Sequence, residues 1–104
     1  MKRYSLDYTN ALEIALAKNG LEFEYLKFND WSVRQLGNCQ AWIIEGCAYD
    51  TVTGEIVDID VLQSYHTAVS YARLDTDEVV RCGKWSTTTS KQQTRFERIY
   101  NPYR

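Results

Sequence analysis

The fold is decided by residues 40–61, whose sequence reads QAWIIEGCAYDTVTGEIVDIDV. Apolar residues dominate the first ten positions, which predicts a strand over 40–49. The segment 50–54 has the turn chemistry of a hairpin loop. After it, apolar and acidic residues alternate in Val57-Asp58-Ile59-Asp60-Val61, so the return strand should have one apolar face and one solvent-exposed face. The stretch predicts an antiparallel β-hairpin.

The chain before this hairpin predicts a helix followed by a strand. Residues 9–18 place apolar side chains on one helical face at Leu12, Ala15 and Leu16, and Asn19-Gly20 is a stop signal. Residues 21–28 alternate with a period of two, and their apolar face consists of Leu21, Phe23 and Tyr25. A further short strand is an option over 31–36.

The chain after the hairpin predicts a second hairpin and a final helix. A strand over 65–74 should carry Tyr65, Thr67, Val69 and Tyr71 on one face, and Asp75-Thr76-Asp77 turns it into a strand over 78–82. Residues 86–100 begin with a Ser/Thr cluster suited to capping. A stripe follows at helical spacing, formed by Gln92, Phe96, Ile99 and Tyr103.

Together these elements predict a single α+β domain over residues 1–104. It should consist of an N-terminal helix, a four- to five-stranded antiparallel meander sheet and a C-terminal helix, with the helices packed on one face. The 104 residues and 44% hydrophobic content are ordinary for one globular core. No run approaches the roughly 18 apolar residues of a membrane span, and the N-terminus lacks an apolar signal core. We therefore expect a cytoplasmic protein with no membrane partner.

Three cysteines cannot all be paired with one another, and a cytosolic chain keeps them reduced. Together with the single histidine they make a three-Cys, one-His set that could close a structural zinc site, Cys39, Cys47, His66 and Cys82. No two of them share a short Cys-x-x-Cys knuckle. The spacing therefore favours buried, metal-free thiols, and no cofactor is expected.

Catalytic motifs are missing from the sequence. It contains no glycine-rich phosphate loop, no His-Glu-x-x-His and no Gly-x-Ser-x-Gly. A Cys/His nucleophile pair would need His66 to meet a cysteine across strands. We therefore expect a non-enzymatic protein that acts by binding.

Charge is divided unevenly along the chain. Residues 1–80 carry six Lys and Arg against thirteen Asp and Glu, whereas residues 81–104 carry six against one. In the last helix Lys91, Arg95 and Arg98 follow one face, and Lys84 lies just before it. This basic stripe is the candidate partner-binding surface, with a merely solvated helix face as the alternative.

Acidic residues of the hairpins give a second hypothesis, in which they mimic nucleic-acid phosphates in a channel of another protein. The residues concerned are Asp50, Glu55, Asp58, Asp60, Asp75, Asp77 and Glu78. Such charge also serves solubility.

Two segments of the C-terminal part carry short motifs. The first, Ser64-Tyr65-His66-Thr67, has the pattern Ser-Tyr-x-Thr. The second, Trp85-Ser86-Thr87-Thr88-Thr89-Ser90-Lys91, has the pattern aromatic-Ser-x-Thr-Thr-Ser at the start of the last helix. Together they resemble a family of small uncharacterised proteins of bacteriophages and mobile elements. The likeness covers about the last forty residues. The family pattern often has His where this chain has Gln92.

The resemblance implies a setting inside a bacterial host. There, small stand-alone domains bind and disable defence proteins, so an anti-CRISPR-like inhibitor of a Cas effector is the resulting hypothesis. The alternatives are an accessory protein that binds nucleic acid through the basic helix, and a small zinc-stabilised interaction domain. The oligomeric state is left open.

Overall fold

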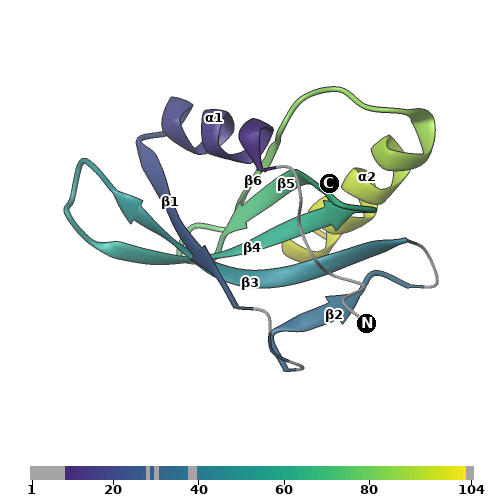
Figure 1. Ribbon diagram of the computed structural model, residues 1–104, viewed down its shortest axis with the longest axis horizontal. Coiled ribbons are helices and arrows are strands. Elements are labelled where there is room, and N and C mark those ends of the chain that lie inside the picture. Colours follow the sequence, from purple (N-terminus) through teal and green to yellow (C-terminus); the bar gives the residue numbers. More distant parts are fainter. Residues whose placement is uncertain (1–8, 28, 30, 38–39, 103–104) are drawn as a thin grey trace.

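A computed structural model of the chain describes residues 9–27, 29, 31–37 and 40–102. The elements are α1 (Asn10–Lys18), β1 (Leu21–Leu26), β2 (Val33–Gln35), β3 (Ala41–Asp50), β4 (Ile56–Ser64), β5 (Thr67–Arg73), β6 (Glu78–Arg81) and α2 (Thr87–Tyr100). All strand pairs are antiparallel. The predicted α+β class and its order of helix, sheet and helix are confirmed (Figure 1). No helix in the described residues is long and apolar enough to span a membrane.

The sheet has six strands in the described part of the chain, whereas the sequence analysis predicted four or five. Strands β3, β4, β5 and β6 form the predicted meander. Both β1 and β2 pair with β3, where β1 lies along residues 46–50 and β2 along residues 42–44. The two short strands therefore lie end to end on the same edge of β3, which local patterning does not reveal.

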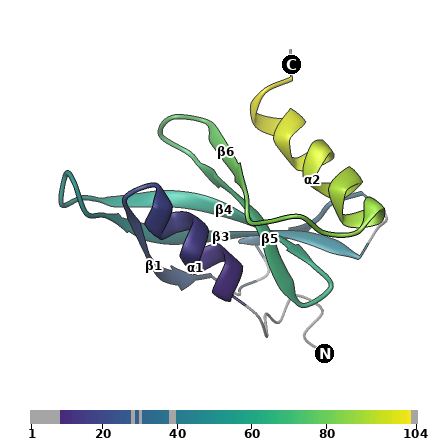
Figure 2. The same ribbon diagram turned by 90° about the horizontal axis from the view of Figure 1, so that it is seen from above.

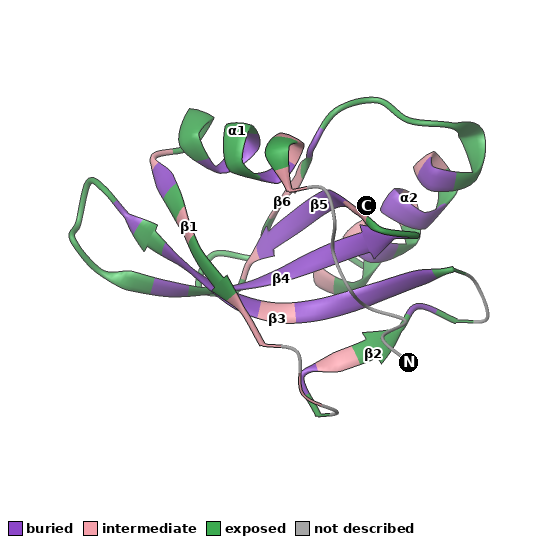
Figure 3. Ribbon diagram, in the orientation of Figure 1, coloured by how far each residue is buried: buried purple, intermediate pink, exposed green. Residues whose placement is uncertain are grey.

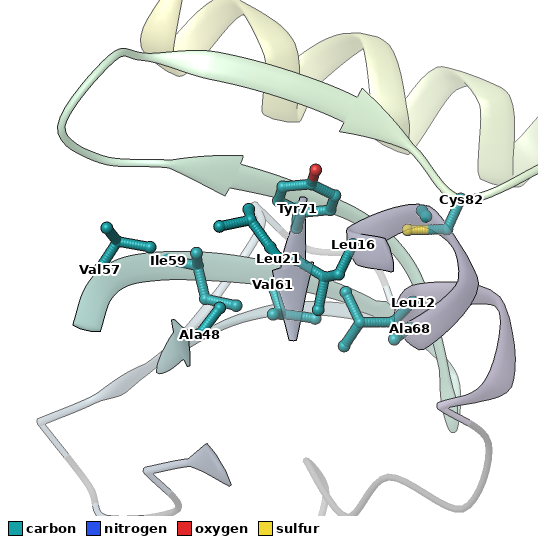
Figure 4. Close-up of a cluster of buried hydrophobic side chains, with 11 residues drawn as sticks. Leu12, Leu16, Leu21, Ala48, Val57, Ile59, Val61, Ala68, Tyr71 and Cys82 are labelled. Atoms are coloured by element: carbon teal, nitrogen blue, oxygen red, sulfur yellow. The ribbon is translucent and has the colours of Figure 1, made fainter. Parts of the chain in front are cut away.

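The helices cover opposite faces of the sheet, so the placement of both on one face was wrong. Alternate residues of β4 enter two different clusters: Ile59 and Val61 pack with α1, and Leu62 packs with Phe96 of α2. Figure 2 shows the helices on either side of the sheet, and Figure 4 shows the cluster beneath α1. The central strands are buried on both faces, so each face needs its own cover (Figure 3).

A β-bulge changes which residues of β1 face the core. Phe23 pairs with Ala48 but Tyr25 pairs with Cys47, so one extra residue lies between them. Leu26 packs against the cluster beneath α1, whereas Tyr25 is 53% exposed. The prediction that Tyr25 shares the face of Leu21 was wrong because the bulge shifts the period of two by one residue.

Tyr65 and His66 form a turn between β4 and β5, where the sequence analysis placed the start of a strand. Ser64 pairs with Thr67 across this turn, Tyr65 has φ of +57°, and the Gln63 side-chain amide donates to the Tyr65 carbonyl. The exposed Tyr65 ring therefore does not continue the face of β5.

A second bulge lies farther along β5. Leu62 pairs with Ser70 and Gln63 pairs with Ala68, which leaves Val69 as the extra residue. Val69 consequently joins the cluster beneath α2, and Tyr71 joins the cluster beneath α1. The prediction that Val69 and Tyr71 share one face was therefore wrong, because they lie on opposite faces of the sheet.

Candidate partner-binding surface

Helix α2 begins where the sequence predicts it, because Ser86 caps its first turn. The Ser86 hydroxyl accepts a hydrogen bond from the Thr89 backbone N–H, at 3.3 Å. The inward face of the helix consists of Thr89, Gln92, Gln93 and Phe96, with Tyr100 partly buried against the same cluster. Ile99 is 47% exposed, so its predicted place on this face was wrong, and Tyr103 lies outside the described residues.

Polar contacts hold much of α2 to the sheet. The Ser64 hydroxyl donates to Gln92 Oε1 at 2.7 Å, and the Gln93 amide donates to the Val69 carbonyl at 2.8 Å. Near the end of the helix, the Tyr100 hydroxyl donates to the buried carboxylate of Asp60. Burial and this hydrogen bond raise the pKa of Tyr100, so its hydroxyl keeps its proton. These directional contacts fix the rotation of α2 about its axis.

With that rotation fixed, the basic stripe points outward, as predicted. Lys91, Arg95 and Arg98 are exposed along α2, and Lys84 is exposed in the loop before it. Among the described residues no carboxylate forms an ion pair with any of the four. Figure 3 shows the exposed loop that leads from β6 into α2. The four side chains form the basic surface, the name used for them below.

One member of the basic surface also contacts the body of the domain. A Cβ atom placed on Gly37 would lie 2.6 Å from both terminal nitrogens of Arg95. The guanidinium therefore lies directly over Gly37, in the connection between β2 and β3. This contact extends the basic surface from the helix onto the neighbouring end of the sheet.

Other arginines of the described chain are neutralised by carboxylates. Arg34 lies 3.5 Å from Asp60, Arg73 lies 2.9 Å from Asp50 and 2.7 Å from Asp75, and Arg81 lies 2.5 Å from Glu97. Glu97 raises the pKa of Arg81, as expected for a close ion pair. Because Glu97 is engaged by Arg81, the one acidic residue of α2 does not offset the basic surface.

The acidic hairpin hypothesis is weakened, because several of its residues have structural roles. Asp50 is buried and accepts hydrogen bonds from the Val52 and Thr53 backbone N–H groups, which lower its pKa, with a further contribution from Arg73. Asp60 is 4% exposed, and Asp75 is paired with Arg73. The expectation of a solvated acidic face therefore fails at Asp50 and Asp60. The exposed remainder consists of Glu55, Asp58, Asp77 and Glu78.

The proposed zinc ligands lie in separate environments. Cys82 is buried beneath α1, whereas Cys47 lies on the other face of the sheet, with its thiol 3.6 Å from the Asp58 carboxylate. His66 is exposed in the β4–β5 turn, and Cys39 lies outside the described residues. Burial raises the pKa of the Cys82 thiol to about 12, which disfavours the thiolate that zinc or nucleophilic attack needs. The described residues contain no group of three or more His, Cys, Asp and Glu that could hold a metal ion.

Two exposed apolar side chains flank the basic surface, and the sequence analysis did not predict either of them as a binding residue. Trp85 follows Lys84 and is 40% exposed, and Ile99 follows Arg98 and is 47% exposed. Large exposed apolar groups beside charges are common where proteins bind partners. The position of Trp85 between Lys84 and the Ser/Thr cluster was the available signal. For Ile99, helical periodicity gave the opposite indication.

The residues that carry the family resemblance meet in the structure. Ser64 hydrogen-bonds both Thr89 and Gln92, and Ser86 caps the helix that presents those two side chains. These side chains thus dock α2 on the sheet, and Gln92 occupies a hydrogen-bonded position. No protein-family model, curated protein or solved structure matches the chain.

Proposed function

We propose that this protein is a non-enzymatic binding module whose basic surface contacts an acidic region of a host bacterial protein. The proposal depends mainly on a contrast between two groups of Lys and Arg residues. Arg34, Arg73 and Arg81 each have a carboxylate partner, whereas the four cations of the basic surface have none among the described residues. An uncompensated cluster on one face raises encounter rates with acidic partners.

The resemblance to phage and mobile-element proteins supports the choice of partner class. In such a setting the chain would act on host defence, and a CRISPR–Cas effector is the leading candidate. Trp85 and Ile99 support a protein partner, because apolar anchors beside a charged rim are typical of protein interfaces. The Cys82 thiol supports the non-enzymatic part, since burial raises its pKa to about 12 and so disfavours a thiolate nucleophile.

Nucleic acid is the alternative partner, since the same cations could contact phosphates. Four phosphate contacts would give a slope of about −3.6 in log K against log salt, well below that of proteins with many contacts. Such binding would be weak at physiological salt. The basic surface therefore supports a protein partner better than a stand-alone nucleic-acid function.

The deciding experiment is affinity capture from a bacterial lysate, with and without nuclease, by the wild type and by the triple variant Lys91→Glu, Arg95→Glu, Arg98→Glu. Lys91→Glu and Arg98→Glu should each alter stability by no more than about 0.5 kcal/mol, because both side chains are exposed, whereas Arg95→Glu also removes the contact over Gly37. We expect that the wild type captures a protein partner both with and without nuclease. The triple variant should fail to capture it, most clearly at low salt. Circular dichroism confirms that the variant is folded.

A matched control separates the basic surface from net charge. The double variant Val52→Glu, Ile56→Glu changes the net charge by the same two units as Lys91→Glu, but both residues are exposed in the β3–β4 hairpin, at the opposite end of the molecule from α2 (Figure 1). It should leave capture unchanged. Partner loss on nuclease treatment would support nucleic acid, and capture unaffected by the triple variant would move the interface to the exposed acidic residues Asp58, Asp77 and Glu78.

A further inference from the structure

A groove runs between α1 and the edge strand β6, on the face opposite α2. Its volume is about 280 Å³, and its walls are formed by Ala11, Ile14 and Lys18 of α1 together with Val80, Cys82 and Gly83 at the end of β6. Ile14 is 58% exposed, so its apolar side chain is accessible at the groove. The basic surface does not take part in this groove, so it is a separate feature of the molecule.

The strand beside the groove has an unpaired edge. β6 pairs with β5 on one side, and in the described residues it is the last strand of the sheet. Its outer backbone N–H and C=O groups can therefore accept another strand. An added strand places alternate side chains on the α1 side of the sheet, where the groove lies.

The size and chemistry of the groove select the occupant. At about 280 Å³ it falls just below the roughly 300–1,000 Å³ typical of small-molecule pockets, and it suits one or two peptide side chains. The apolar side chains of Ala11, Ile14 and Val80 favour the binding of an aliphatic side chain. Lys18 is exposed and forms no ion pair with the described carboxylates, so it favours an acidic neighbour.

We propose that β6 binds an extended segment of a partner protein as an added edge strand, with an aliphatic side chain in the groove and an acidic residue beside Lys18. A second copy of this chain is a poorer occupant. The β6 residues on the α1 side are Glu78, Val80 and, just beyond the strand, Cys82, and both Val80 and Cys82 are already packed in the cluster beneath α1. A second β6 would therefore offer no free aliphatic side chain to the groove.

The test uses a displayed library of random twelve-residue peptides, selected against the full chain and counter-selected against Ile14→Asp. Because Ile14 is exposed, this substitution should leave the fold intact, which circular dichroism checks. We expect enriched peptides that alternate aliphatic and polar residues and contain an acidic residue. Their affinity, measured by fluorescence anisotropy, should fall at least tenfold with Ile14→Asp and also fall with Lys18→Glu.

Strand addition has its own signature. Binding of an enriched peptide should slow hydrogen exchange at backbone amides within residues 78–81, and N-methylation of alternate peptide residues should abolish binding at one set of positions and spare the other. The triple variant of the basic surface should bind the peptide as the wild type does, which keeps this site distinct from the proposed function.

Three outcomes would overturn the proposal. In the first, the selection yields no peptides that prefer the wild type to Ile14→Asp. In the second, enriched peptides bind but slow hydrogen exchange at none of the β6 amides. In the third, the wild type sediments as a dimer and Ile14→Asp sediments as a monomer. The last would assign the groove to a second copy.

Discussion

Ser64 and Gln92 are 28 residues apart in the chain and meet beneath α2, where the Ser64 hydroxyl donates to Gln92 Oε1 at 2.7 Å. Ser64 ends β4 and Gln92 lies in the second turn of α2. Both side chains are buried, so each provides the other with a hydrogen-bond partner that water cannot replace. The hydrogen bond sets the rotation of α2 and, with it, the direction of the basic surface.

Replacement of Ser64 by Ala should cost about 1–3 kcal/mol of unfolding free energy, because it leaves the buried Gln92 Oε1 without its hydrogen-bond donor. Urea unfolding measures the change, and the exposed Thr88→Ala is the control. In a double-mutant cycle with Gln92→Met, the two changes should be less than additive. A loss no larger than that of Thr88→Ala would contradict the structural role of this contact.

Removal of the helix cap by Ser86→Ala should cost about 1 kcal/mol, because the Thr89 N–H loses its acceptor. Thr87→Ala, at the exposed first helical position, should change stability by less than about 0.5 kcal/mol. The comparison is made by thermal and urea unfolding. Equal effects of the two substitutions would show that Ser86 does not cap α2.

Stability should decline in acid partly through Asp50. Its pKa is lowered in the folded chain, first by the Val52 and Thr53 N–H groups and then by Arg73, so its stabilising contribution is present above the unfolded-state pKa. That contribution is lost as the pH falls through the folded-state pKa. Asp50→Asn should therefore be destabilising at pH 7, and its effect should shrink as the pH falls through the folded-state pKa of Asp50.

The control for this profile is Asp77→Asn, in the exposed β5–β6 turn. Asn tolerates the positive φ of +60° that Asp77 adopts, so the turn should persist. A pH profile of Asp50→Asn parallel to that of the wild type would exclude the role given to its carboxylate.

The Cys82 thiol should resist alkylation in the folded protein. Its pKa of about 12 leaves about one thiolate in 10⁴ at pH 8, and its side chain is buried beneath α1. Iodoacetamide labelling with peptide mapping should show at least a hundredfold slower modification of Cys82 in buffer than in guanidinium chloride. Comparable rates would mean that this end of β6 opens readily.

Purified protein should contain well under one zinc per chain after dialysis. Cys82 and Cys47 lie on opposite faces of the sheet, and His66 is exposed in a turn, so these three do not converge. Elemental analysis measures the metal content, with protein refolded in zinc as the positive control. Stoichiometric zinc would restore a ligand role to the cysteines and to His66.

Much of the local structure could be predicted from the sequence alone. Helix α1 is encoded by Leu12, Ala15 and Leu16 at helical spacing, and all three are buried. The β3–β4 hairpin around 50–54 and the cap at Ser86 were predicted in place. These features depend on residues within one turn or one hairpin, so their physical cause lies inside a short window of sequence. The outward direction of Lys91, Arg95 and Arg98 has the same origin.

Only the tertiary structure decided which faces those elements present to one another. A single extra residue in β1 exposes Tyr25, another in β5 separates Val69 from Tyr71, and strand pairing buries Asp60 beside Tyr100. The side-chain period of a strand is two, so one bulge reverses every later face, and its position depends on a partner strand far away in the sequence. The same long-range pairing places α1 and α2 on opposite faces and joins Ser64 to Gln92. The basic stripe and its outward direction were visible in the sequence, but the face of the sheet on which α2 packs follows from contacts that no local period encodes.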